Sequence, residues 1–281
     1  MILSIITINR NNAPGLEKTM ASVLAQTYTV FEYVVVDGAS TDGSVEVIKR
    51  YAEAFGSRIK WVSEPDTGIY NAMNKGIRLA TGEYLEFLNS GDRLVSGNVL
   101  IKMQGACEQN EKPSILYGNM LKEIWVDKSL RSKSFAGKDI TFLGFYTGTL
   151  NHPPAWIKRS LFEKYGLYDE SLHIVSDWKW FLQAIIFGGE KPVYVDEDVV
   201  FFDMTGISER NKELDREERR KVLEMLIPAT ILADYDKNAL FIDQMSRLQR
   251  HRWAYKIVWF LERCLFKVEK RSLLKQNTVH L

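Results

Sequence analysis

Polar side chains follow four apolar stretches in the first third of the sequence, at the point where each stretch ends. These ends are Asn9-Arg10-Asn11, Asp37-Gly38, Glu64-Pro65-Asp66 and Asn89-Ser90-Gly91-Asp92. Carboxylates and amides of this kind suit ribose hydroxyls, the edge of a nucleobase, or a divalent cation that bridges phosphates. Each one alone has an ordinary alternative as a helix cap or a turn. Their coincidence at four ends favours a ligand site instead.

The spacing of apolar residues predicts the elements that carry these ends. The stretches Ile2–Ile8, "FEYVVVDG", "IKWVSEP" and "GEYLEFLN" are typical of buried strands. Helical periodicity lies between them, most clearly in "IYNAMNKGIRLA" from Ile69. Strand and helix alternate four times in about ninety residues, which predicts a parallel, doubly wound α/β sheet. Ligands of such sheets bind beyond the carboxyl ends of the strands, where these polar groups lie.

The turn after the first predicted strand excludes two common nucleotide sites. A dinucleotide site would need G-x-G-x-x-G there, and a phosphate loop would need G-x-x-x-x-G-K-[ST]. The sequence reads "NRNNAPG" at this point. A nucleotide bound here would therefore be recognised by carboxylates and amides rather than by a glycine-rich phosphate-binding loop.

Composition allows one large domain, or one domain with an appendage. The chain has 281 residues, of which 46% are hydrophobic and 26% charged. Its two cysteines, Cys107 and Cys264, lie far apart, so neither a disulfide framework nor a zinc site is predicted, and a reducing cytosol fits best. No run of about 18 apolar residues occurs, so we expect no segment that spans a bilayer.

Four motifs occur in order along the chain: "SIITINRN", "VVVDGASTDGS", "EPDTGIYNAMNKGIRLATGEYLEFLNSGD" and "SDWKWFLQA". Together they resemble the inverting nucleotide-sugar glycosyltransferases of family 2. The resemblance implies a GT-A fold: an α/β, mostly parallel doubly wound sheet with a helical C-terminal extension. It further implies a catalytic domain over 1–210, with a nucleotide-binding half at 1–95 and an acceptor half at 96–210, and an extension over 211–281.

The resemblance also assigns donor-binding roles to residues at the predicted strand ends. Thr7 and Asn9 are expected near the nucleotide, Asp37 at the nucleoside, and Asp66 near the base. Asn89 is expected to hydrogen-bond a hydroxyl of the donor.

A D-x-D-like motif in this family holds a divalent metal, Mn²⁺ or Mg²⁺, on the donor diphosphate. Asp92 matches its last carboxylate, so Asp92 is the expected metal ligand. The sequence departs from the motif because Gly91 and Asn89 stand where further acids are common. Gly91 would let the backbone approach a phosphate closely.

The acceptor side is expected in the second half of the chain. By resemblance, Asp177 is the catalytic base that removes the proton of the acceptor hydroxyl, with Ser176 in place of a preceding acid. Taken alone, Asp177 could be an acidic residue favoured at a helix N-terminus. His152, and Ser208 and Arg210 in a loop that begins at Asp203, are candidate contacts of the diphosphate or the acceptor.

The C-terminal region carries a strong net positive charge. Residues 247–275 contain nine Lys or Arg and two Asp or Glu, hence +7, although the whole chain is only +1. A helix would align Arg252, Lys256, Arg263, Lys267 and Lys270 in one basic stripe beside a broad apolar surface. This helix could contact an anionic membrane, dock on the catalytic domain, or pair with another subunit.

The sequence thus predicts a hexosyl- or N-acetylhexosaminyltransferase. We expect it to move one sugar from a nucleotide-diphospho-sugar, UDP-linked, to a glycan or lipid-linked oligosaccharide in surface-polysaccharide biosynthesis. A cytoplasmic location at the inner face of the membrane and a homo-oligomer are compatible with the sequence, and no nucleic acid is expected as a partner. The alternatives are another nucleotide-binding α/β transferase, such as a nucleotidyltransferase, and a catalytically inactive relative that acts as a subunit.

Overall fold

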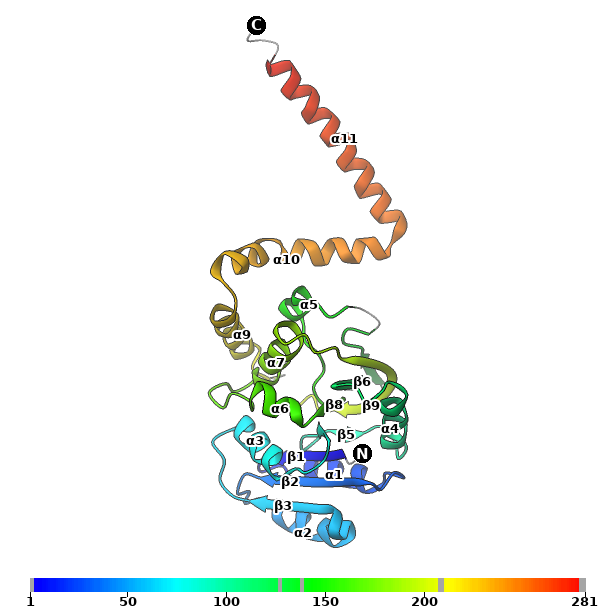
Figure 1. Ribbon diagram of the computed structural model, residues 1–281, viewed down its shortest axis with the longest axis vertical. Helices are drawn as coiled ribbons and strands as arrows, with labels where there is room; N and C mark the ends of the chain where they lie inside the picture. The colour runs from blue at the N-terminus through cyan, green and yellow to red at the C-terminus, as the bar shows by residue number, and fades with distance from the viewer. Residues whose placement is uncertain (1–2, 126–127, 137–138, 207–209, 278–281) are drawn as a thin grey trace. The chain divides into compact units, whose positions relative to one another are not determined.

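A computed structural model describes residues 3–125, 128–136, 139–206 and 210–277 of the chain. The chain divides into two compact units at the boundary between Met225 and Leu226. The first unit contains the sheet and the helices that cover it (Figure 1). The second unit contains α10 (Ala229–Arg250) and α11 (Arg252–Asn277).

The sheet of the first unit has nine strands. Their order is β3-β2-β1-β4-β8-β6-β9-β5, with β7 paired to β6. Their bounds are β1 Leu3–Asn9, β2 Phe31–Asp37, β3 Ile59–Ser63, β4 Tyr84–Phe87, β5 Arg93–Leu94, β6 Ile115–Trp125, β7 Lys128–Ser132, β8 Ala155–Lys158 and β9 Val193–Phe202.

The first four strands are parallel, as the sequence predicts. Asn9 pairs with Asp37, and Asp37 pairs with Ser63, so the carboxyl ends of β1, β2 and β3 lie level with one another. Every residue of β1 and β2 is buried, which accounts for their nearly continuous apolar sequence. This register brings the polar ends of the strands to one edge of the sheet.

The remaining strands form a mixed sheet. β8 is antiparallel to β4 and to β6, and β9 runs parallel to β6 and antiparallel to the short β5. The α/β GT-A fold expected from the sequence is confirmed, with its parallel strand pairs concentrated in the first half.

Helices cover both faces of the parallel strands. Side chains of α1 (Ala13–Leu24), α2 (Ser44–Phe55) and α4 (Val99–Gln109) share one core cluster with Leu3 and Ile5 of β1. Ile6 points to the opposite face, because successive side chains of a strand alternate. There it contacts α3 (Ile69–Leu79), where an added Cβ on Gly76 would lie 2.4 Å from Ile6 Cγ2. The apolar stripe predicted from Ile69 therefore packs closely on β1.

A 3₁₀ turn, Gly56–Arg58, follows α2. The helices of the second half are α5 Phe142–Thr147, α6 Ser160–Tyr165, α7 Ser176–Phe181 with its π-helical continuation Leu182–Phe187, and α9 Lys212–Leu226. The sequence predicts one helix from about Val175 to Phe187, and α7 with its continuation occupies this range.

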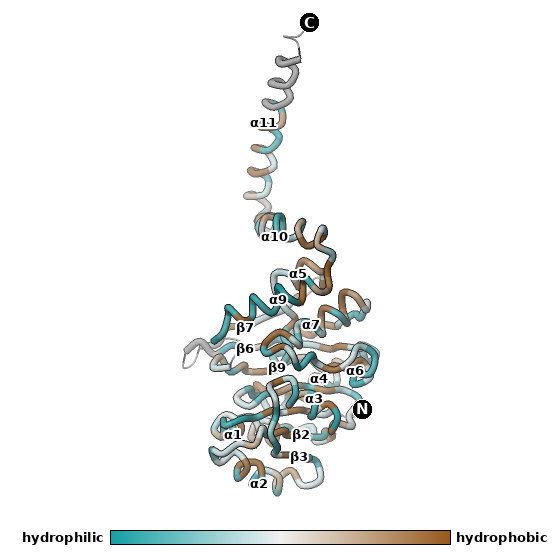
Figure 2. The backbone as a smooth tube through the Cα atoms, turned by 90° about the vertical axis from the view of Figure 1, so that its left-hand side faces the viewer, coloured by the Kyte–Doolittle hydropathy of each residue, from teal (hydrophilic) through white to brown (hydrophobic). Residues whose placement is uncertain are grey.

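The helices of the second unit differ in character from α9. Figure 2 shows α9 as largely hydrophilic, whereas hydrophobic and hydrophilic residues alternate along α11. Among the described residues, no helix combines the length and apolar character needed to cross a membrane.

A carboxyl group is buried in the centre of the sheet. Glu86 on β4 is fully buried, and its Oε2 accepts a hydrogen bond of 3.1 Å from Trp156 Nε1. Its Oε1 has no hydrogen-bond partner among the described residues. Burial raises the pKa of Glu86 to about 8, and the Trp156 N–H only partly opposes this shift.

The raised pKa makes the stability of the fold depend on pH. Between the unfolded pKa of Glu86 and about 8, the folded state holds the extra proton, so the free energy of unfolding falls as pH rises through this range. Glu86→Gln keeps an acceptor for Trp156 and cannot ionise. We expect its melting temperature to exceed that of the wild type by several degrees more at pH 8 than at pH 5, at about 2–4 °C per kcal/mol.

Glu83→Gln is the matched control, because Glu83 lies three residues earlier and is exposed. Equal melting-temperature differences for Glu86→Gln at the two pH values would show that Glu86 does not carry the pH dependence.

Candidate active site

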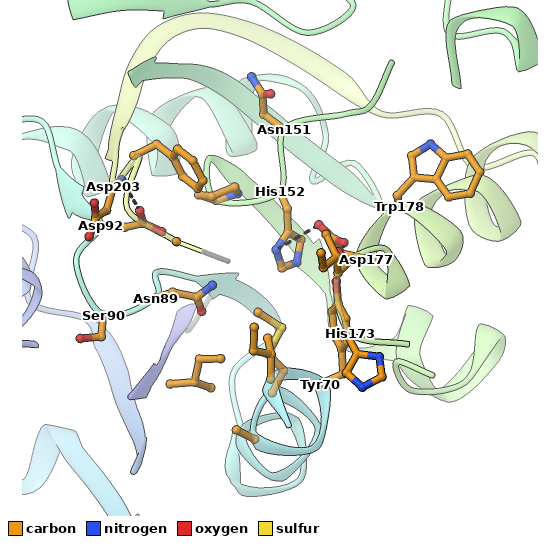
Figure 3. A pocket seen from close by; sticks show the side chains of 18 of the residues that line it. Tyr70, Asn89, Ser90, Asp92, Asn151, His152, His173, Asp177, Trp178 and Asp203 are labelled. Carbon is orange, nitrogen blue, oxygen red and sulfur yellow. Dashed lines mark hydrogen bonds and ion pairs between the residues drawn. The ribbon is translucent and has the colours of Figure 1, made fainter. Parts of the chain in front are cut away.

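A cavity of about 640 Å³ opens at the carboxyl ends of the parallel strands. Its walls come from the ends of β1 and β4, from α3 and α7, from the segment before β8, and from α9. Figure 3 shows Asp92 and Asp203 together on one side, and Asp177, His152 and Tyr70 on the other. Six residues singled out from the sequence line it: Asn9, Asp66, Asn89, Asp92, His152 and Asp177.

Asp37 is a buried anchor beside this cavity. Its carboxylate accepts hydrogen bonds from Asn9 Nδ2 at 2.8 Å, Ser40 Oγ at 2.6 Å, Ser40 N at 2.9 Å and Ser63 Oγ at 2.7 Å. Burial would raise its pKa, but these donors outweigh burial and lower it. Asp37 is not among the described residues that line the cavity, so in this structure it acts on the site by holding Asn9.

Two amide oxygens at the cavity have no partner. With Asn9 Nδ2 held by Asp37, the Asn9 Oδ1 atom is buried and accepts no hydrogen bond from any described residue. Asn89 Oδ1 is also buried and accepts no hydrogen bond from any described residue. Because buried polar atoms are normally paired, these two acceptors are where donor groups of a ligand would fit.

Thr7 lies beneath the cavity rather than at its surface. The residue is fully buried, and its hydroxyl donates to the Leu88 carbonyl at 2.7 Å and lies 2.9 Å from Tyr33 Oη. It thus joins the ends of β1 and β4, which carry Asn9 and Asn89.

Asp66 combines a turn contact with a place in the cavity wall. Its Oδ1 accepts from the Gly68 N–H at 3.1 Å, just before α3, and lies 3.7 Å from Arg10 Nη1. Its side chain is 6% exposed. The alternative considered from the sequence is a helix cap, but Gly68 is the N-cap of α3 and no described side chain caps it, so Asp66 instead makes a turn contact and lines the cavity.

Asp92 lies beside a second carboxylate that the sequence analysis missed. Asp92 Oδ1 accepts from the backbone N–H of Asp203 at 2.8 Å. Gly91 has φ +107°, and an added Cβ there would lie 2.3 Å from Asp203 Oδ2, so Asp203 occupies the space that a side chain at 91 would need. Burial raises the pKa of Asp92 to about 8, and the Asp203 carboxylate adds to the shift against the opposing backbone N–H.

A signal for Asp203 was present in the sequence. Asp203 directly follows the apolar end of β9, just as Asp37 ends β2 and Asp92 lies shortly after β4. The polar strand ends that predict the site belong to the first four predicted strands, and Asp203 lies outside them, at the start of a predicted loop.

Asp177 lies in the first turn of α7, opposite the acidic pair (Figure 3). Its Oδ1 accepts from Tyr70 Oη at 2.9 Å, and its Oδ2 lies 4.0 Å from His152 Nδ1. Its side chain is 25% exposed, which leaves the carboxylate accessible from the cavity. Burial lowers the pKa of His152, although the Asp177 carboxylate opposes this. At neutral pH the imidazole is therefore uncharged.

α9 forms part of the cavity wall, although the sequence analysis placed its residues in the C-terminal extension. Glu218 accepts from the backbone N–H groups of His173 at 2.7 Å and Ile174 at 2.9 Å, just before α7. Arg219 stacks 4.7 Å from the centre of the Trp178 ring and donates to the Gly148 carbonyl. The α9 residues that line the cavity are Lys212, Asp215 and Arg219.

Two of the candidate contacts are not brought to the cavity by the described structure. Arg210 is exposed just before α9 and is not among the described residues that line the cavity. Ser208 lies outside the described residues.

Comparison with known proteins identifies the family. Residues 4–166 match the family described as glycosyl transferase family 2. An uncharacterized glycosyltransferase of Mycobacterium tuberculosis is 34% identical over 214 residues, which cover 73% of this chain and 76% of that protein. A PGL/p-HBAD biosynthesis glycosyltransferase of Mycobacterium bovis is 30% identical over 180 residues, which cover 63% of this chain and 67% of that one.

Two solved structures share the fold. S. aureus TarS 1–349, solved in complex with UDP and also with UDP-GlcNAc, has a TM-score of 0.61 and 19% identity; in the UDP complex the match covers 80% of this chain and 66% of that one. The mannosyltransferase PcManGT from Pyrobaculum calidifontis, in complex with GDP-Man and Mn²⁺, has a TM-score of 0.60 and 19% identity, covering 78% and 64%. At this identity the likeness concerns the fold alone. With the family match over more than half of its length, the chain belongs to glycosyl transferase family 2 and is a glycosyltransferase with the GT-A fold.

Proposed function

We propose that this enzyme transfers a single hexosyl or N-acetylhexosaminyl group from a UDP-linked sugar to a hydroxyl of a glycan or lipid-linked oligosaccharide, with inversion at the anomeric carbon. The observation that carries the proposal is the arrangement of the cavity. An acidic pair suited to a cation on a diphosphate lies on one side, and the accessible carboxylate of Asp177 lies on the other (Figure 3). An inverting displacement needs its base on the face opposite the leaving group.

The nucleotide-binding half, 1–95, supplies the donor contacts. We assign the unpaired Oδ1 atoms of Asn9 and Asn89 to hydroxyl groups of the donor, and Asp66 to the base. Asp37 keeps Asn9 in place through its own hydrogen bonds. The complexes of TarS with UDP-GlcNAc and of PcManGT with GDP-Man support a sugar nucleotide as the ligand.

The donor set at Asp92 and Asp203 fits a divalent cation. Burial, together with the neighbouring Asp203 carboxylate, raises the pKa of Asp92, and a cation between the two acidic groups would compensate their negative charge. No group of three or more acidic, His or Cys ligands occurs among the described residues. Mg²⁺ or Mn²⁺ is commonly bound by one or two carboxylates together with substrate phosphates and water. When bound, the cation would neutralise charge on the leaving diphosphate.

Asp177 acts as the general base in this proposal. It removes the proton of the acceptor hydroxyl while the acceptor oxygen bonds to the anomeric carbon. The bond from that carbon to the diphosphate oxygen breaks, and the diphosphate leaves with the electron pair. The acceptor half, which we extend from 96–210 to include α9, provides Trp178 and Arg219 beside this carboxylate.

A lipid-linked acceptor would lie at a membrane surface. The second unit provides a surface that suits such an acceptor. On α11, Trp253 is 71% exposed, Phe260 63% and Leu265 65%. Exposed basic side chains lie on the same helix at Lys256, Arg263 and Lys267. The side chains of Arg252 and Lys270 lie outside those that the structure describes. We propose that α11 contacts an anionic membrane surface from the cytoplasmic side.

The first test concerns the base. Asp177→Asn keeps the shape of the side chain but cannot take a proton, so we expect the transfer rate to fall by about 10² or more while UDP-sugar binding persists. Single-turnover transfer and equilibrium binding of the donor measure the two effects. Asp139→Asn, an exposed carboxylate outside the cavity lining, is the control. Near-normal turnover in Asp177→Asn would remove Asp177 from the mechanism.

The second test concerns the cation. We expect Asp92→Asn and Asp203→Asn each to lose the Mn²⁺-dependent increase in melting temperature that UDP produces in the wild type. Without ligands, Asp92→Asn should be at least as stable as the wild type at neutral pH, because burial raises the pKa of Asp92 to about 8 and the amide needs no proton to be neutral. If both variants keep the Mn²⁺-dependent increase, these residues do not hold the cation.

The third test concerns α11. Charge reversal to Glu at Lys256, Arg263 and Lys267 should weaken binding to phosphatidylglycerol vesicles about 100-fold or more, since each basic residue contributes about 1 kcal/mol near such a surface. Transfer to a short soluble acceptor should be unchanged. Binding of the wild type should also weaken as salt rises.

Charge reversal at three exposed basic residues of the first unit, Lys18, Lys49 and Arg78, is the control for net charge. Equal loss of vesicle binding in both triple variants, or wild-type protein that ignores the vesicles, contradicts the membrane contact. Dissociation of an oligomer by the α11 variant would assign the surface to a subunit contact.

A further inference from the structure

We propose that Tyr70, His152 and Tyr168 form a positioning frame for Asp177 that fixes the direction of its carboxylate and presents one oxygen to the acceptor hydroxyl. This inference rests on the proposed role of Asp177 as the base. The frame is drawn from three separate parts of the chain: α3, the segment before β8, and the segment before α7.

Tyr70 holds one oxygen of the carboxylate. Its hydroxyl lies 2.9 Å from Asp177 Oδ1 and 2.5 Å from the Ile174 carbonyl, so its single proton is shared between two acceptors near the start of α7. The side chain is 4% exposed. Burial, with the nearby Asp177 charge, raises the pKa of Tyr70 well above its usual value, so the hydroxyl stays a donor.

Tyr168 determines which nitrogen of His152 carries the proton. Tyr168 Oη lies 2.8 Å from His152 Nε2, and both residues are buried. Burial raises the pKa of Tyr168 well above its usual value, so its hydroxyl can donate to Nε2. A neutral imidazole that accepts at Nε2 carries its hydrogen on Nδ1. Nδ1 is the atom that lies 4.0 Å from Asp177 Oδ2.

Aromatic packing prevents the imidazole from turning away. The ring of His152 is stacked on Phe87, with centroids 4.9 Å apart and an interplanar angle of 26°. The rings of Tyr168 and Phe181 meet it edge-on, each with a centroid distance of 5.8 Å. A ring confined on these sides keeps its Nδ1–H directed toward the carboxylate.

The frame leaves lone pairs of the Asp177 carboxylate free in one direction, toward the cavity. Oδ1 is engaged by Tyr70, and Oδ2 is faced by the Nδ1–H of His152, so the remaining lone pairs on the cavity side take the acceptor proton. The hydrogen bond from Tyr70 and the nearby imidazole therefore fix the direction of the carboxylate. Other charged groups around α7 are paired elsewhere, Lys179 with Asp169 at 2.6 Å and His173 with Glu218 at 3.0 Å.

A direct contact with substrate is a weaker account of His152. The uncharged imidazole adds no electrostatic attraction for a phosphate, and its Nε2 is already engaged by Tyr168. Tyr168 is not among the described residues that line the cavity, so its effect on transfer must pass through His152.

The experiment compares Tyr70→Phe and Tyr168→Phe with Tyr84→Phe. Tyr84 is a buried tyrosine whose hydroxyl donates to the Pro113 carbonyl, away from the cavity, so Tyr84→Phe controls for the loss of a buried hydroxyl. For Tyr70→Phe and for Tyr168→Phe, we expect kcat to fall about tenfold with the donor KM unchanged, because each change removes a hydrogen bond of the frame that fixes the direction of the Asp177 carboxylate.

The tautomer of His152 provides a readout that does not depend on activity. Nitrogen-15 NMR of the imidazole, assigned with a His152→Gln sample, should show the hydrogen on Nδ1 in the wild type and on Nε2 in Tyr168→Phe. His152→Asn places an amide N–H near the position of Nδ1 and should retain more activity than His152→Leu.

The outcomes separate this frame from the proposed base. If Asp177→Asn is inactive but Tyr70→Phe and Tyr168→Phe match Tyr84→Phe in kcat and in the tautomer of His152, the frame is wrong and the base assignment stands. If Asp177→Asn turns over normally, the base assignment fails and the frame fails with it.

Discussion

Burial of carboxylates is the physical constraint on which this site depends. An ionised carboxylate is costly inside a protein unless hydrogen bonds or opposite charges compensate it. Asp37 receives four hydrogen bonds, and Glu218 receives backbone N–H groups from three consecutive residues, His173, Ile174 and Val175. The pKa of each is lowered despite burial. These two carboxylates therefore act as structural anchors.

Asp92 is compensated far less. It receives the Asp203 N–H but also faces the Asp203 carboxylate, and its pKa is raised. The pKa of Asp37 is lowered and that of Asp92 is raised. We therefore infer that Asp37 stabilises the fold and that Asp92 is available to a ligand. Glu86 is also poorly compensated, but it lies within the sheet and is absent from the described lining of the cavity, so it has no ligand to meet. Poor compensation thus indicates a site only where the group also reaches a cavity.

The first half of the fold was predictable from sequence because its signals are local. Continuous apolar strands, the stripe from Ile69 and the polar strand ends all lie within short windows, and parallel pairing then brings Asn9, Asp66, Asn89 and Asp92 to one edge. The rest depends on contacts between distant residues. Tyr70 and Asp177 are 107 positions apart, and Asp92 and Asp203 are 111. No periodicity reports such pairs, and the hydrophilic sequence of α9 gave no sign that it would form part of the cavity wall.

Gly91 links the distant pair Asp92 and Asp203 to the D-x-D-like motif, in which Gly91 stands where an acid is common. A carboxylate at 91 would need both a side-chain-tolerant backbone and the space beside Asp92. The backbone there has φ +107°, and the space is taken by the Asp203 side chain. Asp203, just after the end of β9, thus occupies the space of the acid that the motif lacks at position 91. The site therefore has two carboxylates, of which only Asp92 belongs to the motif. Gly91 is then required by Asp203, because any larger residue would strain the turn and displace the second carboxylate.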